Sequence, residues 1–265
     1  GSSSNLASAY GIAVTGDMVI TSILAVFLLN QAWKWPLILT LAVMVPLIVL
    51  ESLFLAANLT KVIDGGYIPI IFAAFLCVVM WTWVKGSAHV KRKSRDSSIT
   101  LDSLMRMLEK STPVEVAGTA VFLTADPEIT PPALLHNLKH NRVLHKQNFI
   151  VTVTVEPVPE VPEIDRLQIE RLNDRFVKMN LTFGYMDDQN VPKALALARK
   201  QGEKFDIMTT SFFLNHRSFR SAPNEGLPRW QEKLFISMAR GATNATEFYR
   251  LPTNRVLELG QQLTI

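Results

Sequence analysis

The sequence predicts a bundle of membrane-spanning helices followed by a water-soluble α/β domain. Residues 1 to 84 contain neither Arg nor His and only five charged side chains, which are Asp17, Lys34, Glu51, Lys61 and Asp64. A basic cluster follows directly after Val84. Beyond residue 113, short apolar segments with strand periodicity alternate with helical segments, as in layered α/β domains. The chain therefore changes solvent, from lipid to water, near residue 85.

Three apolar segments have the length of membrane spans, at about 7–29, 36–57 and 67–84. Roughly 20 helical residues are needed to cross a hydrocarbon layer of about 30 Å. The third segment is shorter, but Tyr67, Trp81 and Trp83 place aromatic rings at its two ends, where lipid headgroups are expected. The links between the segments are short, so consecutive helices must lie antiparallel and adjacent. We assign residues 1–85 to three transmembrane helices.

The basic cluster sets the orientation. Lys85, Lys91, Arg92, Lys93 and Arg95 follow the third span, and the positive-inside rule places such a cluster in the cytoplasm. We therefore expect a multi-pass protein of a bacterial plasma (inner) membrane, with a cytoplasmic C-terminal domain. The chain then enters its first span from outside, and it begins without methionine or a signal peptide. We expect further helices upstream in a longer protein.

Asp17 lies in the middle of the first span. An ionised carboxylate there costs about 3 kcal/mol or more unless it faces a polar interior, so it is a candidate for ion passage or coupling. Helical spacing puts Tyr10 and Thr21 on the same face. The alternative is an acid that is protonated or hydrogen-bonded and only holds helices together.

Glu51 is the second acid inside a span and the fourth candidate for the ion path. It either pairs with a polar group on a neighbouring helix or reaches the outer surface. Pro46, in the same span, either kinks the helix or interrupts it to form an ion site. Ala7, Gly11 and Thr15 recur every four residues and predict close helix packing.

The soluble part divides into a basic juxtamembrane segment with an amphipathic connector over residues 86–112, and an α/β domain over 113–265. The connector, 97–111, carries Leu101, Leu104, Met105 and Leu108 at helical spacing. The domain is predicted to have strands at 118–124, 149–155, twice within 166–183, at 205–213 and at 255–265. Helices are predicted at 131–141, at 192–201 and from about 228.

The helix at 131–141 and its flank carry His136, His140 and His145 among basic residues. A metal site is disfavoured because no acid or cysteine lies close by and the basic charge repels cations. Lys139, His140 and Arg142 are instead candidates for contact with an anion or nucleotide, and the alternative is an ordinary solvated helix face.

Several functions are excluded. Cys77 is the only cysteine, so neither a disulfide nor a thiolate zinc cluster can form within the chain. The net charge of +4 is concentrated after the third span rather than forming a nucleic-acid patch. Phosphate-loop, nucleophile-elbow and dinucleotide-binding motifs are missing, so we expect neither an enzyme nor a bound cofactor.

Five segments resemble the Kup/HAK/KT family of potassium uptake transporters. They are SSNLASAYGIAVTG (3–16), ANLTK (57–61), GGYIP (65–69), GTAVFLT (118–124) and PALLHNLKHN (132–141), and LPTNRVLELG (251–260) resembles the family's C-terminal end. The matches are long, ordered and spread over nearly the whole chain. One departure is Asp17, where the family phrase leads us to expect threonine or another uncharged residue.

This resemblance implies a LeuT-like transporter fold of twelve spans, of which the present three are the tenth to twelfth. It implies potassium uptake coupled to proton entry, a homodimer, and in some members inhibition by a cyclic dinucleotide. The main potassium site and coupling acids lie on upstream helices in this family. The alternative function is a membrane-anchored regulatory or dimerisation module without transport, which the polar first span argues against.

Overall fold

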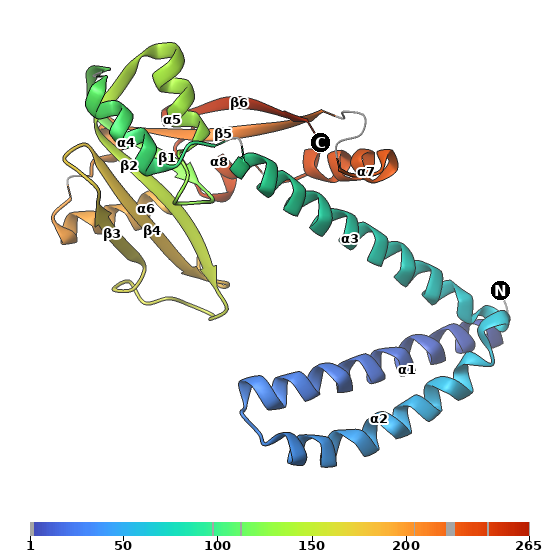
Figure 1. Cartoon of the computed structure of the whole chain (residues 1–265). Helices are drawn as coiled ribbons and strands as arrows, with labels where there is room; N and C mark the ends of the chain where they lie inside the picture. Colours follow the sequence, from blue (N-terminus) through green and yellow to red (C-terminus); the bar gives the residue numbers. More distant parts are fainter. Residues whose placement is uncertain are drawn as a thin grey trace. The chain divides into compact units, whose positions relative to one another are not determined.

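A computed structural model describes residues 3–96, 98–111, 113–203, 205–220, 226–242 and 244–264. The chain forms two compact units, residues 1–82 and 83–265 (Figure 1). The first is helical and the second is built on one sheet, which confirms the predicted fold class.

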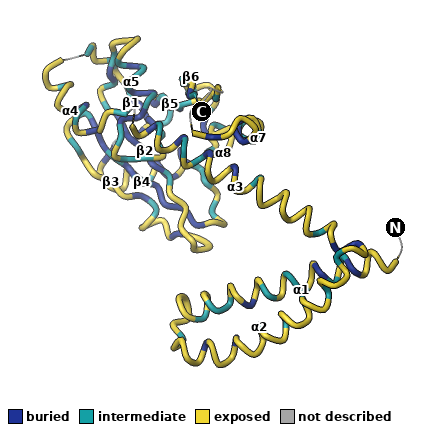
Figure 2. The backbone as a smooth tube through the Cα atoms, turned by 45° about the vertical axis from the view of Figure 1, so that its right-hand side comes forward, coloured by how far each residue is buried: buried dark blue, intermediate teal, exposed yellow. Residues whose placement is uncertain are grey.

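The first unit contains the helices α1 (Ser3–Phe27) and α2 (Leu37–Leu59) and the start of α3 (Tyr67–Asp96). Single π turns, Leu28–Ala32 and Val62–Gly66, join or extend them. All three helices are long and apolar enough to cross a membrane. Most residues of these helices are exposed on the unit, as the yellow colour of the tube in Figure 2 indicates. Many of them are large and hydrophobic, and lipid is the solvent that such a surface requires.

Of the two alternatives at Pro46, the structure does not show an interruption, because α2 runs through Pro46 as one helix. The expected end of the third helix is corrected. The third helix does not end at Val84 but continues to Asp96, because charged residues end the apolar stretch without ending helix propensity. Cys77, which lies in the apolar stretch of α3, is exposed on the unit.

The second unit has a six-stranded sheet in the order β3-β4-β2-β1-β5-β6. All neighbouring pairs are parallel except β3 with β4. The strands are β1 (Val114–Thr124), β2 (Val143–Glu156), β3 (Leu167–Arg171), β4 (Phe176–Gly184), β5 (Thr210–Arg220) and β6 (Val256–Thr264). The centres of β1 and β2 are buried on both faces, as in sheets covered by helices on each side.

Helices cover both faces of this sheet. α4 (Leu101–Lys110) and α5 (Pro132–His136, continued by a π turn over Asn137–Asn141) pack on the face that carries Phe122 and Ile150. α6 (Val191–Leu195, continued as a 3-10 helix over Ala196–Gln201) packs on the other face. α7 (Arg229–Arg240) and α8 (Ala245–Phe248) lie between β5 and β6 in the sequence.

Two parts of the soluble unit differ from expectation. The segment predicted as a connector contains α4, whose Leu101 and Leu104 are buried in the domain core, so α4 is part of the domain; Ser97 lies outside the described residues. The strand predicted at 205–213 begins only at Thr210. Before it, the side chain of Asp206 accepts a hydrogen bond from the backbone N–H of Met208 and caps a 3-10 turn.

Candidate functional site

In the membrane unit, α1 and α2 pack closely through a small residue. A Cβ atom on Gly11 would lie 2.9 Å from Oδ1 of Asn58, so a larger residue would push the helices apart. Ser8, Ile12 and Ser22 are buried on the same side of α1. The predicted small-residue stripe is therefore a packing surface at Gly11.

Asp17, Tyr10 and Thr21 lie on the opposite side of α1 and are exposed on the unit. They share one helix face, as their spacing predicts. α2 does not cover this face, so within the described residues the acid is not held by a partner of the bundle. Its face is free for another helix or for an aqueous path.

Glu51 is placed differently, on the face of α2 that packs against α1. It lies two turns from Asn58 and is half-buried, and its Oε2 atom has no hydrogen-bond partner in the described part of the chain. The structure therefore does not bring Asp17 and Glu51 together. A buried carboxyl oxygen without a partner is unusual and marks Glu51 as more than a surface acid.

In the soluble unit, the strand order creates a notch at the carboxyl edge of the sheet. The chain runs from β1 to β2 and β4 on one side, and then returns to β5 and β6 on the other. β1 ends at Thr124, whereas its neighbours β2 and β5 continue to Glu156 and Arg220. Ligands of open α/β sheets bind where the strand order reverses in this way.

The notch holds a cavity of about 320 Å³, which we call the edge crevice. Leu123, Val151 and Val153 form its apolar wall, and Tyr249 and Arg217 also line it. Partial burial of the Tyr249 hydroxyl raises its pKa, so it stays protonated and can donate a hydrogen bond. The mixture of an apolar wall and a few polar groups is typical of small-molecule sites.

Two polar groups in the edge crevice lack partners. Arg217 is exposed, the structure gives it no ion pair or hydrogen bond to any described residue, and partial desolvation lowers the pKa of its guanidinium. Asn215 donates to Gln261 Oε1 over 2.9 Å, but its Oδ1 is buried without a partner. An unpaired cation beside an unpaired acceptor suits a ligand with both an anionic group and hydrogen-bond donors.

The sequence did not identify this site, because Arg217 stands alone in a strand. Lys139, His140 and Arg142, the residues that it did suggest, lie at the other edge of the sheet, where α5 ends and β2 begins. The rings of His136 and His140 stack with centroids 5.7 Å apart, and Lys139, His140 and Arg142 are exposed. A helix C-terminus carries partial negative charge and is an unfavourable place for an anion.

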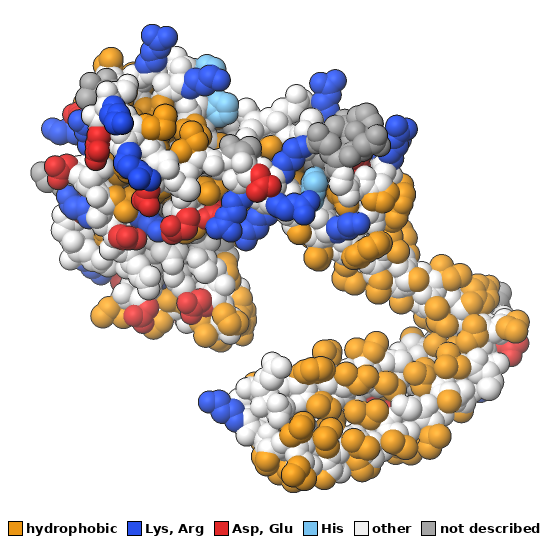
Figure 3. Space-filling view, in the orientation of Figure 1, with side chains coloured by type: hydrophobic (Ala, Val, Ile, Leu, Met, Phe, Trp, Pro, Cys, Tyr) orange, Lys and Arg blue, Asp and Glu red, His pale blue; other side chains and the backbone are white. Residues whose placement is uncertain are grey.

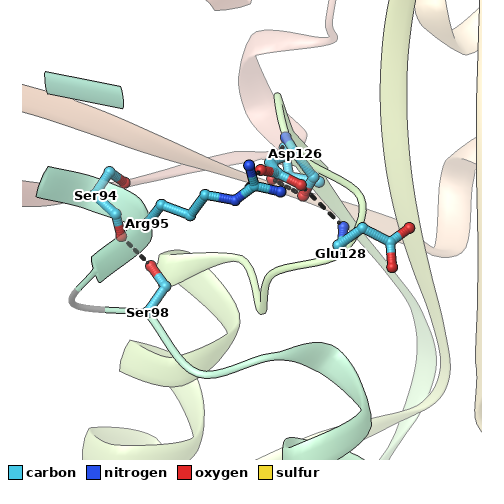
Figure 4. Close-up of polar contacts among 6 residues, drawn as sticks. Ser94, Arg95, Ser98, Asp126 and Glu128 are labelled. Atoms are coloured by element: carbon cyan, nitrogen blue, oxygen red, sulfur yellow. Dashed lines mark hydrogen bonds and ion pairs between the residues drawn. The ribbon is translucent and has the colours of Figure 1, made fainter. Parts of the chain in front are cut away.

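The loop after β1, which borders the edge crevice, is tied to the end of α3. Arg95 Nε lies 3.4 Å from Asp126 Oδ2, and Asp126 Oδ1 accepts a hydrogen bond from the N–H of Glu128. Figure 4 shows these contacts, with Ser98 donating to the carbonyl of Ser94. The loop beside the crevice and the last turn of the helix thus form one connected network.

Apolar helices of membrane length, joined to a mostly parallel sheet with a crevice, define a multi-pass membrane protein with a soluble α/β domain. Comparison with known proteins gives its family. Residues 1–88 match the K+ potassium transporter integral membrane domain, and residues 117–265 match the K+ potassium transporter C-terminal domain. The chain belongs to this family, the Kup/HAK/KT potassium transporters, and is not an enzyme.

Similar proteins carry the same family name. The chain is 53% identical over 268 residues to "Probable potassium transport system protein Kup 2" of Sinorhizobium medicae and 51% identical to the protein of that name in Rhizobium meliloti. It is 49% identical over 265 residues to Kup 2 of Mesorhizobium japonicum. Each comparison covers 100% of this chain but 42% of the relative.

Proposed function

We propose that this chain is the C-terminal part of a potassium uptake transporter. The observation that carries the proposal is the match of the two consecutive family domains over nearly the whole chain, joined in the order of membrane part and soluble part. The three apolar helices would then be the tenth to twelfth spans of a LeuT-like fold. Potassium would bind mainly to helices outside this sequence.

Proton-coupled symport is the mechanism that we propose for the whole transporter. Asp17 supports it because an acid on an uncovered helix face, beside Tyr10 and Thr21, is suited to exchange protons along a polar path. Glu51 supports it because its carboxyl oxygen is buried without a partner in the described residues. The two acids would act at separate points.

Replacing Asp17 with Asn in the full-length protein is expected to flatten the pH dependence of potassium uptake, because the amide cannot exchange a proton. Uptake of rubidium between pH 5.5 and 8 measures the effect. Asp64→Asn is the matched control, since Asp64 lies in the link before α3 rather than inside an apolar stretch. A pH profile of Asp17→Asn that superimposes on the wild type would remove Asp17 from the coupling mechanism.

We further propose a bacterial inner-membrane location with the soluble domain in the cytoplasm. Lys85, Lys91, Arg92 and Lys93 follow the apolar part of α3, and short basic segments of this kind stay on the cytoplasmic side.

Regulation by a cyclic dinucleotide, in a homodimer, is the role that we propose for the soluble domain. The edge crevice supports it, because Arg217 can pair with a phosphate while the apolar wall and Asn215 Oδ1 receive a base. The Arg95–Asp126 pair gives such a ligand a route to α3.

Replacing Arg217 with Gln should weaken binding of a cyclic dinucleotide about tenfold, since a charge-assisted hydrogen bond contributes roughly 1.5–3 kcal/mol. Calorimetry on the detergent-solubilised full-length protein measures it. Arg142→Gln is the matched comparison at the opposite edge of the sheet. Weakening by Arg142→Gln alone would move the site to Lys139, His140 and Arg142.

A further inference from the structure

α7 packs on α3 just where the apolar stretch of α3 gives way to basic residues. The rings of Phe235 and Trp83 lie with centroids 5.4 Å apart, and Val90, Leu227 and Leu263 complete the buried cluster around Phe235. Trp83 is one of the two tryptophans that end the apolar stretch, and Lys85 follows it. Tryptophan at this place marks the boundary between hydrocarbon and headgroups.

A glycine permits this contact. A Cβ atom on Gly86 would lie 2.3 Å from Cδ2 of Phe235, closer than atoms can approach. The Phe235 ring of α7 therefore lies directly against the backbone of α3 at Gly86, beside Trp83. This close approach fixes which side of α7 faces α3 and which faces away.

The side of α7 that faces away is basic, and we call it the basic face. It carries Arg229, Trp230, Lys233 and Arg240, all exposed, with Trp230 53% exposed. The structure gives its three cations no ion pair with any described residue. Glu232, the one acid of α7, is buried at 1% exposure on the inner side, so it does not neutralise this face. Figure 3 shows blue side chains gathered around this part of the molecule.

We propose that the basic face of α7 binds the anionic headgroups of the lipid leaflet next to it, with Trp230 inserted at the headgroup level. A helix with cations and an exposed tryptophan on one side, held at the membrane boundary, has the chemistry of an interfacial helix. The proposal rests on the cytoplasmic orientation proposed above, because anionic lipid is concentrated in that leaflet.

A second copy of the chain fits this surface less well than lipid does. A symmetric contact would bring the basic face against itself and oppose three cations with three cations. Lys91 and Arg92 of α3 are also exposed and add to the positive field. A lipid surface that carries negative charge resolves this repulsion, and a basic protein surface does not.

The test places a nitroxide spin label on α7 in the full-length transporter in lipid nanodiscs. Ser237, exposed on the basic face, is replaced by Cys in a background free of other reactive cysteines. Met208, which is 66% exposed before β5, receives the reference label. Accessibility to oxygen, which enters lipid, is compared with accessibility to a water-soluble nickel chelate, in discs with and without phosphatidylglycerol.

With phosphatidylglycerol present, the label at 237 should be more accessible to oxygen than to the nickel chelate. The label at 208 should be more accessible to the nickel chelate. The triple variant Arg229→Glu, Lys233→Glu and Arg240→Glu should lose the oxygen preference, since each cation is worth about fivefold in binding to an anionic surface. Arg229→Lys, Lys233→Arg and Arg240→Lys, which preserve the charge, should retain it.

Three results would overturn the proposal. Equal nickel accessibility at 237 and 208 would show that the face is in water. The same oxygen accessibility at 237 in discs with and without phosphatidylglycerol would show that the cations of α7 do not bind anionic headgroups. Dipolar broadening at 237 would identify a second copy as the partner. None of these readings needs transport, so a failure of the proposed uptake activity would be seen separately, in the uptake assay.

Discussion

Replacing Phe235 with Ala is expected to destabilise the packing of α7 on α3 by about 3–4 kcal/mol, the usual cost of removing a buried phenyl ring. Phe235 is 2% exposed, and it contacts Trp83 and Phe219, whose ring centroid lies 5.6 Å away. Gly86, which faces the ring, has no side chain that could fill the space. Removing the ring would therefore leave a cavity against the backbone of α3 at Gly86.

Hydrogen exchange of the detergent-solubilised protein measures this effect. Amide protection in α7 and in residues 83–96 should fall by about a hundredfold, which corresponds to roughly 3 kcal/mol. Ser237→Ala, on the exposed face of the same helix, is the control and should leave protection unchanged. Unaltered protection in Phe235→Ala would mean that α7 is not held to α3 by this ring.

Replacing Asp187 with Ala is expected to cost the soluble domain about 3 kcal/mol, because its carboxylate joins two loops through charge-assisted hydrogen bonds. Its Oδ2 accepts from the backbone N–H groups of Val161 (3.0 Å) and Gly184 (2.8 Å). Its Oδ1 accepts from Arg166 Nη2 at 2.7 Å. Alanine would leave two N–H groups and a guanidinium without this acceptor.

The same group gives a pH dependence with a definite sign. Burial acts to raise the pKa of Asp187, but the N–H groups of Val161 and Gly184 and the charge of Arg166 together lower it below the ordinary value of 3.8. Its contribution to stability is therefore complete above the ordinary pKa and is lost as the pH falls through the lowered one. Denaturation by urea between pH 2.5 and 6 should show this acid loss in the wild type and its reduction in Asp187→Ala.

Asp188→Asn is the control for this prediction. Asp188 pairs with Arg250 at 3.0 Å, but both side chains are more than half exposed, so little stability is expected from the pair. If Asp188→Asn were as destabilising as Asp187→Ala, the loop junction would not depend on the buried carboxylate.

Much of the fold is predictable from the sequence, for physical reasons that differ between elements. Each membrane helix can be predicted from its own composition, because a run of about twenty apolar residues is typical of a membrane-spanning helix. The centres of β1 and β2 can be predicted as buried strands because their residues form continuous apolar runs. The extension of α3 to Asp96 was not predicted, because a basic cluster indicates where the membrane ends and not where the helix ends. Trp83, Gly86 and Val90 continue one face of the helix beyond the membrane span.

The candidate sites were less predictable, because they depend on how helices and strands pack side by side. Asp17 and Glu51 could be singled out because acids are rare in lipid, but their placement on different helix faces required the structure. The edge crevice arises because β1 stops short between β2 and β5, and pairing of that kind cannot be read from any one segment. Arg217 could be recognised as a candidate ligand-binding residue only from the structure, in which β5 places it beside this notch.

The measurement that tests the central claim most directly is rubidium uptake by the full-length parent protein in cells that lack their own potassium uptake. It is made with and without an uncoupler of the proton gradient. We predict saturable uptake that potassium competes for and that collapses when the uncoupler is added. Absence of uptake at every pH and gradient, from a protein shown to be present in the membrane, would contradict transport and favour a membrane-anchored regulatory or dimerisation module.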